Sequence, residues 1–190
     1  IDVSADHEVQ SVYSFSVIAT DAADNVSSEQ SVSLDINDLD DTAATITSGD
    51  SADAINENTG AGQVIYTAIA DDSADVSDGV TFSLADGSDA GLSIDSVSGD
   101  VTLAADPDFE SQDQYSFTVV ATDAAGNEVE QAVTLDINDL DEIAPTITSS
   151  DTADAIDENN DSMVIYTATA DDSADISAGV TFTLGAGSDA

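Results

Sequence analysis

Short stretches in which apolar and polar residues alternate follow one another along almost the whole chain. Alternation with a period of two is typical of β-strands that bury one face, and these stretches are rich in Val, Ile, Thr, Tyr and Phe. Clusters of Gly, Asp, Asn and Ser separate them, as turns do. The middle of the chain predicts strands at 63–70, 80–85, 92–95, 100–104, 115–122 and 130–138. No stretch has the periodicity of a helix.

The whole pattern recurs after about a hundred residues. "DINDLD" occurs at 35–40 and at 136–141, and "VIYTAIADDSAD" at 64–75 is followed by "VIYTATADDSAD" at 164–175. Small differences in spacing fall between the predicted strands, where insertions are tolerated. The sequence therefore predicts the C-terminal part of one repeat (1–41), a complete middle repeat (42–141) and the N-terminal part of the next (142–190).

A further strand opens each repeat, because "TITS" follows both copies of "DINDLD". Seven short strands in a repeat of about a hundred residues, separated by turns, favour a Greek-key β-sandwich. The expected fold class is all-β, with tandem seven-stranded Greek-key sandwiches along the chain.

The charge of the chain excludes several partners. Its 190 residues include 41 acidic side chains and no Lys or Arg, for a formal net charge of -41. Nucleic acid and anionic membrane surfaces would both repel it, and no apolar run approaches the roughly 18 residues that span a bilayer. High acidity can also indicate disorder, but 41% of the residues are hydrophobic and alternate with polar ones.

Neither disulfides nor a leader segment can be identified. The chain has no Cys, so disulfides do not stabilise it. It begins with Ile1 and has no signal-like segment, so we expect a piece of a longer protein.

The acidic residues lie between the predicted strands and recur with the repeat. In the middle repeat they include Glu57, "ADDSAD" at 70–75, "DPDFE" at 106–110 and Asp123. Carboxylate, Asn and backbone oxygens from several loops are the ligands that Ca²⁺ prefers, whereas Mg²⁺ requires stricter octahedral geometry. Zn²⁺ would require His or Cys, and the chain has one His and no Cys. The alternative is a solvated acidic surface. Recurrence with the fold favours Ca²⁺.

Five motifs in this order resemble those of cadherin repeats: "INEN" at 55–58, "DFE" at 108–110, "ATD" at 121–123, and "DIND" at 136–139 followed by "APTI" at 144–147. Near-identical tandem copies rich in Asp, Ser, Thr and Ala are similar to the cadherin-like repeats of giant bacterial surface adhesins. His7 and Phe109 stand at the position of an Arg in the family motif, and His7 is interpreted as a variant at that position rather than as a catalytic base.

The resemblance implies Ca²⁺ sites at the boundaries between repeats. At the first boundary, between the N-terminal part and the middle repeat, the implied ligands are Asp6, Glu8, Asn37, Asp38, Asp40, Asp71, Asp72, Asp75 and Asp123. At the second boundary, between the middle repeat and the C-terminal part, they are Glu57, Asp108, Glu110, Asn138, Asp139, Asp141, Asp171, Asp172 and Asp175. Calcium would hold together the like charges of each "DINDLD" segment.

These observations predict a calcium-rigidified structural spacer repeat of a long extracellular adhesin or filament at the cell surface. An adhesive module, homotypic or carbohydrate-binding, is the alternative, although a chain without Trp and with few aromatic residues offers a poor platform for sugars. An enzyme is not expected, because the chain has no Cys nucleophile, no Lys and no His–Ser–Asp arrangement.

The outer parts of the chain each contain only some of the strands of a sandwich. An open sheet of this kind cannot bury its apolar face alone. The two parts are complementary, and together they lack the equivalent of 91–102. We therefore expect neighbouring repeats or copies of the same protein as partners, joined by covalent continuation or by strand complementation. Asp21 would then join Asp171, Asp172 and Asp175 of the neighbour at a Ca²⁺ site.

Overall fold

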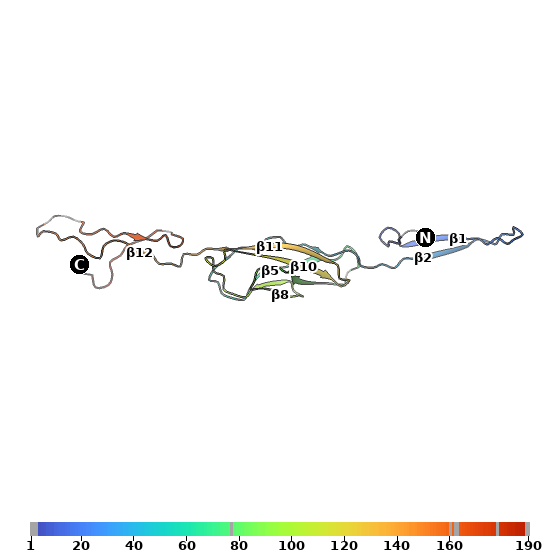
Figure 1. Ribbon diagram of the computed structural model, residues 1–190, viewed down its shortest axis with the longest axis horizontal. Coiled ribbons are helices and arrows are strands. Elements are labelled where there is room, and N and C mark those ends of the chain that lie inside the picture. Colours follow the sequence, from blue (N-terminus) through green and yellow to red (C-terminus); the bar gives the residue numbers. More distant parts are fainter. Residues whose placement is uncertain (1–3, 77, 160, 162–163, 178, 189–190) are drawn as a thin grey trace.

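A computed structural model describes residues 4–188 apart from 77, 160, 162–163 and 178. The chain is elongated, and the N-terminal part, the middle repeat and the C-terminal part follow one another along its length (Figure 1). Every regular element of the described residues is a β-strand. The described part has no helix with the length and apolar character that a membrane crossing requires.

The first sheet of the middle repeat has four strands in the order β4-β11-β10-β7. Its centre is a long antiparallel pair, β10 (Gln114–Asp123) and β11 (Glu128–Asn138), with Phe117 opposite Val133. β7 (Val80–Leu84) pairs antiparallel with the second half of β10. β4 (Ile55–Asn56) pairs parallel with the end of β11 and so reaches the second boundary.

The second sheet has three strands in the order β5-β9-β8, formed by β5 (Gln63–Thr67), β9 (Asp100–Leu103) and β8 (Leu92–Ile94). Beside it, β3 (Thr45–Ile46) pairs with β6 (Ala70–Asp71). The sequence predicted a single strand over 63–70. That prediction was wrong, because the pairing with the β9 side ends at Ala68, whose N–H donates to the Gly99 carbonyl at 2.8 Å. From Ile69 onward the chain pairs with β3 instead, since the Thr47 N–H donates to the Ile69 carbonyl at 2.8 Å.

The core lies between the two sheets and is built from the alternating apolar positions that the sequence indicated. Val101, Leu103, Val119, Val133 and Leu135 are fully buried. The rings of Tyr66 and Phe117 meet edge to face at 5.7 Å between centroids, an arrangement that aromatic pairs prefer. The all-β sandwich is therefore confirmed, as are the predicted strands at β7 to β11. β4 was not predicted.

The outer parts contain matching pieces of the same pattern. In the N-terminal part, β1 (Val12–Val17) and β2 (Gln30–Asp35) form an antiparallel hairpin. In the C-terminal part, β12 (Thr146–Ile147) pairs with β13 (Ala170–Asp171), as β3 pairs with β6 in the middle repeat. Both outer parts expose apolar side chains.

Candidate metal centres at the repeat boundaries

The second boundary forms where β4 and β11 end side by side. Because these strands are parallel, Glu57 follows β4 at the point where the linker leaves β11. The Leu140 N–H donates to Glu57 Oε1 at 2.6 Å, and the Phe109 N–H donates to Glu57 Oε2 at 2.8 Å. Both carboxylate oxygens of this fully buried side chain thus accept backbone hydrogen bonds, and these fix Glu57 against the linker.

Three carboxylates converge at this position. Glu57, Glu110 and Asp139 each offer an oxygen, and these oxygens all lie within 4.8 Å of one another. Asp139 Oδ1 is buried without a hydrogen-bond partner among the described residues. Burial and the neighbouring charges of Asp175 and Glu57 raise the pKa of Asp139. A backbone hydrogen bond lowers the pKa of Glu110, but burial and the charges of Glu57, Glu142 and Asp139 outweigh it, so that the pKa is raised.

The C-terminal part contributes further oxygens to the same boundary. The Glu142 N–H donates to Asp175 Oδ2 at 3.0 Å, and Asn58 Nδ2 donates to Glu142 Oε2 at 2.6 Å. Burial raises the pKa of Glu142, followed by the charges of Glu57 and Asp175. Hydrogen bonds from the Glu142 and Ile176 N–H groups lower the pKa of Asp175. Acidic groups from both sides of the linker therefore share one electrostatic environment.

The first boundary brings together a second group of three, Asp40, Asp72 and Asp123, whose oxygens also lie within 4.8 Å of one another. Asp72 and Asp123 are buried. Asp72 Oδ2 has no hydrogen-bond partner in the described structure. Burial raises the pKa of Asp40, and the charges of Asp123, Asp72 and Asp75 raise it further.

Asn127 orients this group from the turn between β10 and β11. Its Nδ2 donates to Asp123 Oδ2 at 2.8 Å and to the backbone oxygen of Asp40 at 3.3 Å. Burial alone would raise the pKa of Asp123, but the hydrogen bonds from Asn127 and Gly126 lower it overall. On the other side of the linker, the Asp41 N–H donates to Asp75 Oδ2 at 3.2 Å. The linker is thus held by side chains of the middle repeat.

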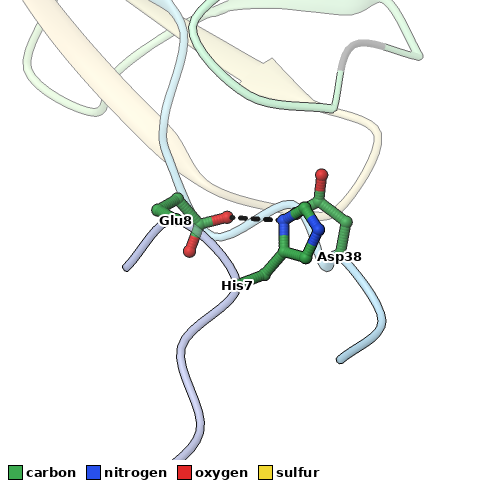
Figure 2. Close-up of side chains that lie close together, drawn as sticks. All are labelled: His7, Glu8 and Asp38. Atoms are coloured by element: carbon green, nitrogen blue, oxygen red, sulfur yellow. Dashed lines mark ion pairs between the residues drawn. The ribbon is translucent and has the colours of Figure 1, made fainter. Parts of the chain in front are cut away.

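A third group lies on the N-terminal side of the first boundary and contains the single His of the chain. His7 Nδ1 lies 3.1 Å from Asp38 Oδ1 and 3.6 Å from Glu8 Oε1 (Figure 2). Glu8 and Asp38 are the repeat equivalents of Glu110 and Asp139. A protonated imidazole at this position would offset part of the carboxylate charge.

The two three-carboxylate groups fit a hard divalent cation. The chain has no Lys or Arg with which to neutralise them, and a buried carboxylate without a partner is costly. Among the described residues, two side-chain oxygens are buried without partners, Asp72 Oδ2 and Asp139 Oδ1, and each belongs to one of the three-carboxylate groups. Several oxygen ligands from different loops form the donor set that Ca²⁺ takes.

Several predicted ligands lie outside the three groups. Asp71 Oδ1 and Asp171 Oδ1 accept hydrogen bonds from Ser73 N–H and Ser173 N–H in matching turns. Hydrogen bonds from Val9, Asn25, Ser111 and Ser177 reach the carboxylates of Asp6, Asp21, Asp108 and Asp172, respectively. The side chain of Asn138 donates a hydrogen bond to Asn56. Two further predicted ligands, Asn37 and Asp141, are exposed. Asp75 and Asp175 accept hydrogen bonds from the linkers.

Sequence reasoning missed three residues that shape these centres: Asn58, Asn127 and Glu142. Each stands in a motif already singled out, since Asn58 closes "INEN", Asn127 ends "ATDAAGN" and Glu142 follows "DINDLD". Each also recurs in another repeat, because Asn25 is equivalent to Asn127, Asn159 to Asn58 and Asp41 to Glu142. This recurrence could have identified them from the sequence.

Comparison with known proteins agrees with this architecture. Residues 53–138 match the cadherin domain family. Mouse cadherin-23 (extracellular domains 22 to 24) is 24% identical with a TM-score of 0.54, covering 77% of this chain and 49% of that structure. Protocadherin gamma B7 (domains 1 to 4) is 22% identical with a TM-score of 0.56, and the match covers 78% of this chain and 38% of that structure. A cis-dimer structure of protocadherin gammaB7 (domains 3 to 6) is 22% identical with a TM-score of 0.53, and the match covers 76% of this chain and 37% of that structure.

The matched residues lie within the middle repeat, whose fold is similar to that of a cadherin domain. The chain spans less than half the length of each of these three structures. The likeness therefore concerns the fold.

Proposed function

We propose that this chain is a calcium-rigidified spacer segment of a long extracellular adhesin or filament, in which Ca²⁺ ions at the repeat boundaries hold neighbouring sandwiches in line. One observation carries the proposal. Asp72 Oδ2 and Asp139 Oδ1 are buried without partners in the part of the chain that the structure describes, and each lies in a three-carboxylate group at a boundary. A bound cation would satisfy these oxygens and relieve the repulsion around them.

The geometry supports a mechanical role for the ion. Each group combines the linker with two other segments, since Asp139 lies in the linker, whereas Glu57 and Glu110 come from separate loops of the middle repeat. An ion bound by all three would fix the linker against the sandwich. Without it, like charges repel and the linker is free to bend.

Long reach and exposure outside the cell also agree with the composition. Near-identical tandem repeats add length rather than new chemistry, and the giant bacterial surface adhesins that the sequence resembles are built in this way. A chain without Cys relies on other means of stabilisation. The proposal involves no catalytic chemistry.

Small-angle X-ray scattering with and without Ca²⁺ tests the proposal. The maximum dimension should be larger and better defined with Ca²⁺ than with EGTA, and Mg²⁺ should substitute poorly. Replacing Asp139 and Asp141 by Asn should abolish the response of the second boundary while the sandwich stays folded. Asp86→Asn, an exposed turn residue beyond β7, removes one charge elsewhere and serves as the control. An identical scattering profile in Ca²⁺ and EGTA would refute the proposal.

A further inference from the structure

One side-chain group at the first boundary contains a nitrogen donor. His7 Nδ1 lies 3.1 Å from Asp38 Oδ1 and 3.6 Å from Glu8 Oε1 (Figure 2). One donor atom of each residue lies within 4.8 Å of the other two. The two three-carboxylate groups offer oxygen alone, so this group differs from them in chemistry. His7 is the single His of a chain without Cys.

A short turn carries His7 and Glu8. The Val9 N–H donates to Asp6 Oδ1 at 3.0 Å, and the Gln10 N–H donates to the Asp6 carbonyl at 3.0 Å. Local hydrogen bonds of this kind, from backbone N–H groups to the side chain and carbonyl of one Asp, stabilise turns. The backbone at His7 and Glu8 is therefore fixed by contacts within the turn itself.

The middle repeat forms the same turn. The Ser111 N–H donates to Asp108 Oδ1 at 2.9 Å, and the Gln112 N–H donates to the Asp108 carbonyl at 2.9 Å. Glu110 of this turn converges with Asp139 of the following linker, as their repeat equivalents do in the N-terminal part. The approach of the two acids is therefore a property of the repeat.

A backbone hydrogen bond also holds the linker beside the turn in both repeats. The Ile36 N–H donates to the Ser11 carbonyl at 2.8 Å, as the Ile137 N–H donates to the Asp113 carbonyl at 2.8 Å. Asp38 lies two residues beyond Ile36. Its carboxylate therefore comes from a segment whose backbone is attached to the end of the turn.

The separations within the group fit a tetrahedral Zn²⁺ site. Zn²⁺ binds His nitrogen at about 2.0–2.1 Å and carboxylate oxygen at about 2.0–2.2 Å, so that two ligands of a tetrahedron lie about 3.4 Å apart. This value falls between the 3.1 Å and 3.6 Å that separate His7 Nδ1 from the two carboxylate oxygens. Imidazole suits Zn²⁺, whereas Ca²⁺ takes oxygen ligands.

We propose that His7, Glu8 and Asp38 form a site for Zn²⁺, with water in the fourth position. The inference assigns Glu8 and Asp38, which the family resemblance implied as Ca²⁺ ligands, to a different cation. The site shares no residue with the three-carboxylate group of the same boundary, so the inference does not rest on the proposed function. A bound Zn²⁺ would join the turn to the linker through side chains as well as through the backbone.

The middle repeat supplies a matched variant, because Phe109 stands at the position of His7 in the same turn. His7→Phe therefore removes the imidazole and introduces a side chain that the turn already accommodates. Glu8→Gln removes a carboxylate and leaves His7 beside Asp38. Asp86→Asn, which removes one exposed carboxylate far from this group in the sequence, is the control.

Isothermal titration of Zn²⁺ into the full chain tests the inference, in millimolar Ca²⁺ so that sites that prefer Ca²⁺ are occupied. The wild type and Asp86→Asn should bind one Zn²⁺ per chain in the tightest phase. His7→Phe and Glu8→Gln should each weaken that phase at least about tenfold, because replacing even an outer partner of a metal ligand costs about 10–100-fold in affinity. Co²⁺ gives a second readout, since its visible absorption should show tetrahedral coordination in the wild type and lose it in His7→Phe.

Equal Zn²⁺ affinity in the wild type and His7→Phe would show that His7 forms only an ion pair with the carboxylates, and it would overturn the inference. An unchanged affinity in Glu8→Gln would overturn it too, because the imidazole would then bind Zn²⁺ without the group. If no tight Zn²⁺ phase is found while Ca²⁺ still extends the chain in scattering, the proposed function stands and this inference alone fails.

Discussion

Glu57 Oε1 accepts a 2.6 Å hydrogen bond from the Leu140 N–H, 83 residues further along the chain. This contact joins the loop after β4 to the linker that follows β11. Glu57 Oε2 meanwhile accepts from the Phe109 N–H at 2.8 Å. One fully buried side chain thus holds the linker and the "DFE" loop together, and it does so with both of its oxygens.

Glu57→Gln should therefore destabilise the middle repeat in Ca²⁺-containing buffer. A Gln side chain has one acceptor oxygen, so one backbone N–H would face an amide donor instead of a carboxylate. A buried donor left without its partner costs about 1–3 kcal/mol. The melting temperature should fall accordingly, and the Ca²⁺ response of the second boundary should be lost.

Glu158→Gln provides the matched control, because Glu158 is the repeat equivalent of Glu57 but is exposed. In dilute protein it should change the unfolding free energy by no more than about 0.5 kcal/mol. Equal melting temperatures for the two variants would show that the buried contacts of Glu57 contribute nothing.

Gly99→Ala should destabilise the sandwich more than Gly126→Ala. Both glycines have a positive φ, +75° and +94°, which costs any residue with a Cβ about 1–2 kcal/mol. At Gly99 a Cβ would also lie 2.3 Å from the Ala68 carbonyl oxygen, whereas at Gly126 nothing lies within 4 Å. Overpacking adds about 1–3 kcal/mol. Chemical denaturation of the two variants measures the difference, and equal losses would contradict the close approach of Gly99 to Ala68.

The same contact shows why part of the fold could not be predicted from the sequence. Alternation is a local property, so it predicted the strands that bury one face, such as β9 and β10. It could not show that the strand predicted over 63–70 changes partner near Ala68, because that break depends on Gly99, which lies 31 residues away. β4 is only two residues long and is defined by its parallel pairing with β11.

The candidate site, too, could be predicted only in part from the sequence. The resemblance to cadherin repeats predicted its place at the boundaries, where acids recur with the repeat. Which acids converge could not be predicted. The carboxylate of Asp71 caps its own turn through Ser73, whereas its neighbour Asp72 points into the group with Asp40 and Asp123. Two adjacent identical residues differ only in the contacts that the tertiary structure gives them.

Asp72→Asn should have opposite effects with and without Ca²⁺. In EGTA it removes one of three crowded negative charges, including the buried Oδ2 that has no partner in the described structure, so the melting temperature should rise. In Ca²⁺ it removes a ligand, so the variant should melt below the wild type. Ligand binding stabilises the native state by roughly 2.7 kcal/mol at a hundred times the dissociation constant, and that gain should shrink.

Asp172→Asn is the control for these opposite effects on the melting temperature. Asp172 is the repeat equivalent of Asp72 in the C-terminal part, but it is not buried as Asp72 is. In dilute protein its melting curves should match the wild type in both buffers. A variant Asp72→Asn that is less stable in EGTA as well would indicate a packing role and argue against a cation site.

The last prediction concerns pH. The pKa values of Asp40, Asp139 and Glu142 are raised, in each case by burial first and by neighbouring carboxylates next. A raised pKa means that the folded protein binds more protons than the unfolded chain, whose ordinary values are 3.8 for Asp and 4.5 for Glu. The resulting stabilisation is complete below those ordinary values and is lost as pH rises through the raised ones.

The metal-free protein should therefore melt at a higher temperature as pH falls from neutral toward the ordinary Glu value of 4.5. Asp123 and Asp175 have lowered pKa values and act in the opposite sense. Their contribution is lost only as pH falls below 3.8, outside this range and below the isoelectric point near 4.1.

Because Ca²⁺ requires deprotonated carboxylates, the difference in melting temperature between Ca²⁺ and EGTA should narrow over the same range. Asp139→Asn should flatten the metal-free slope, whereas Asp86→Asn should leave it unchanged. A metal-free melting temperature that falls on acidification would show that the crowded carboxylates do not govern the stability of the boundaries.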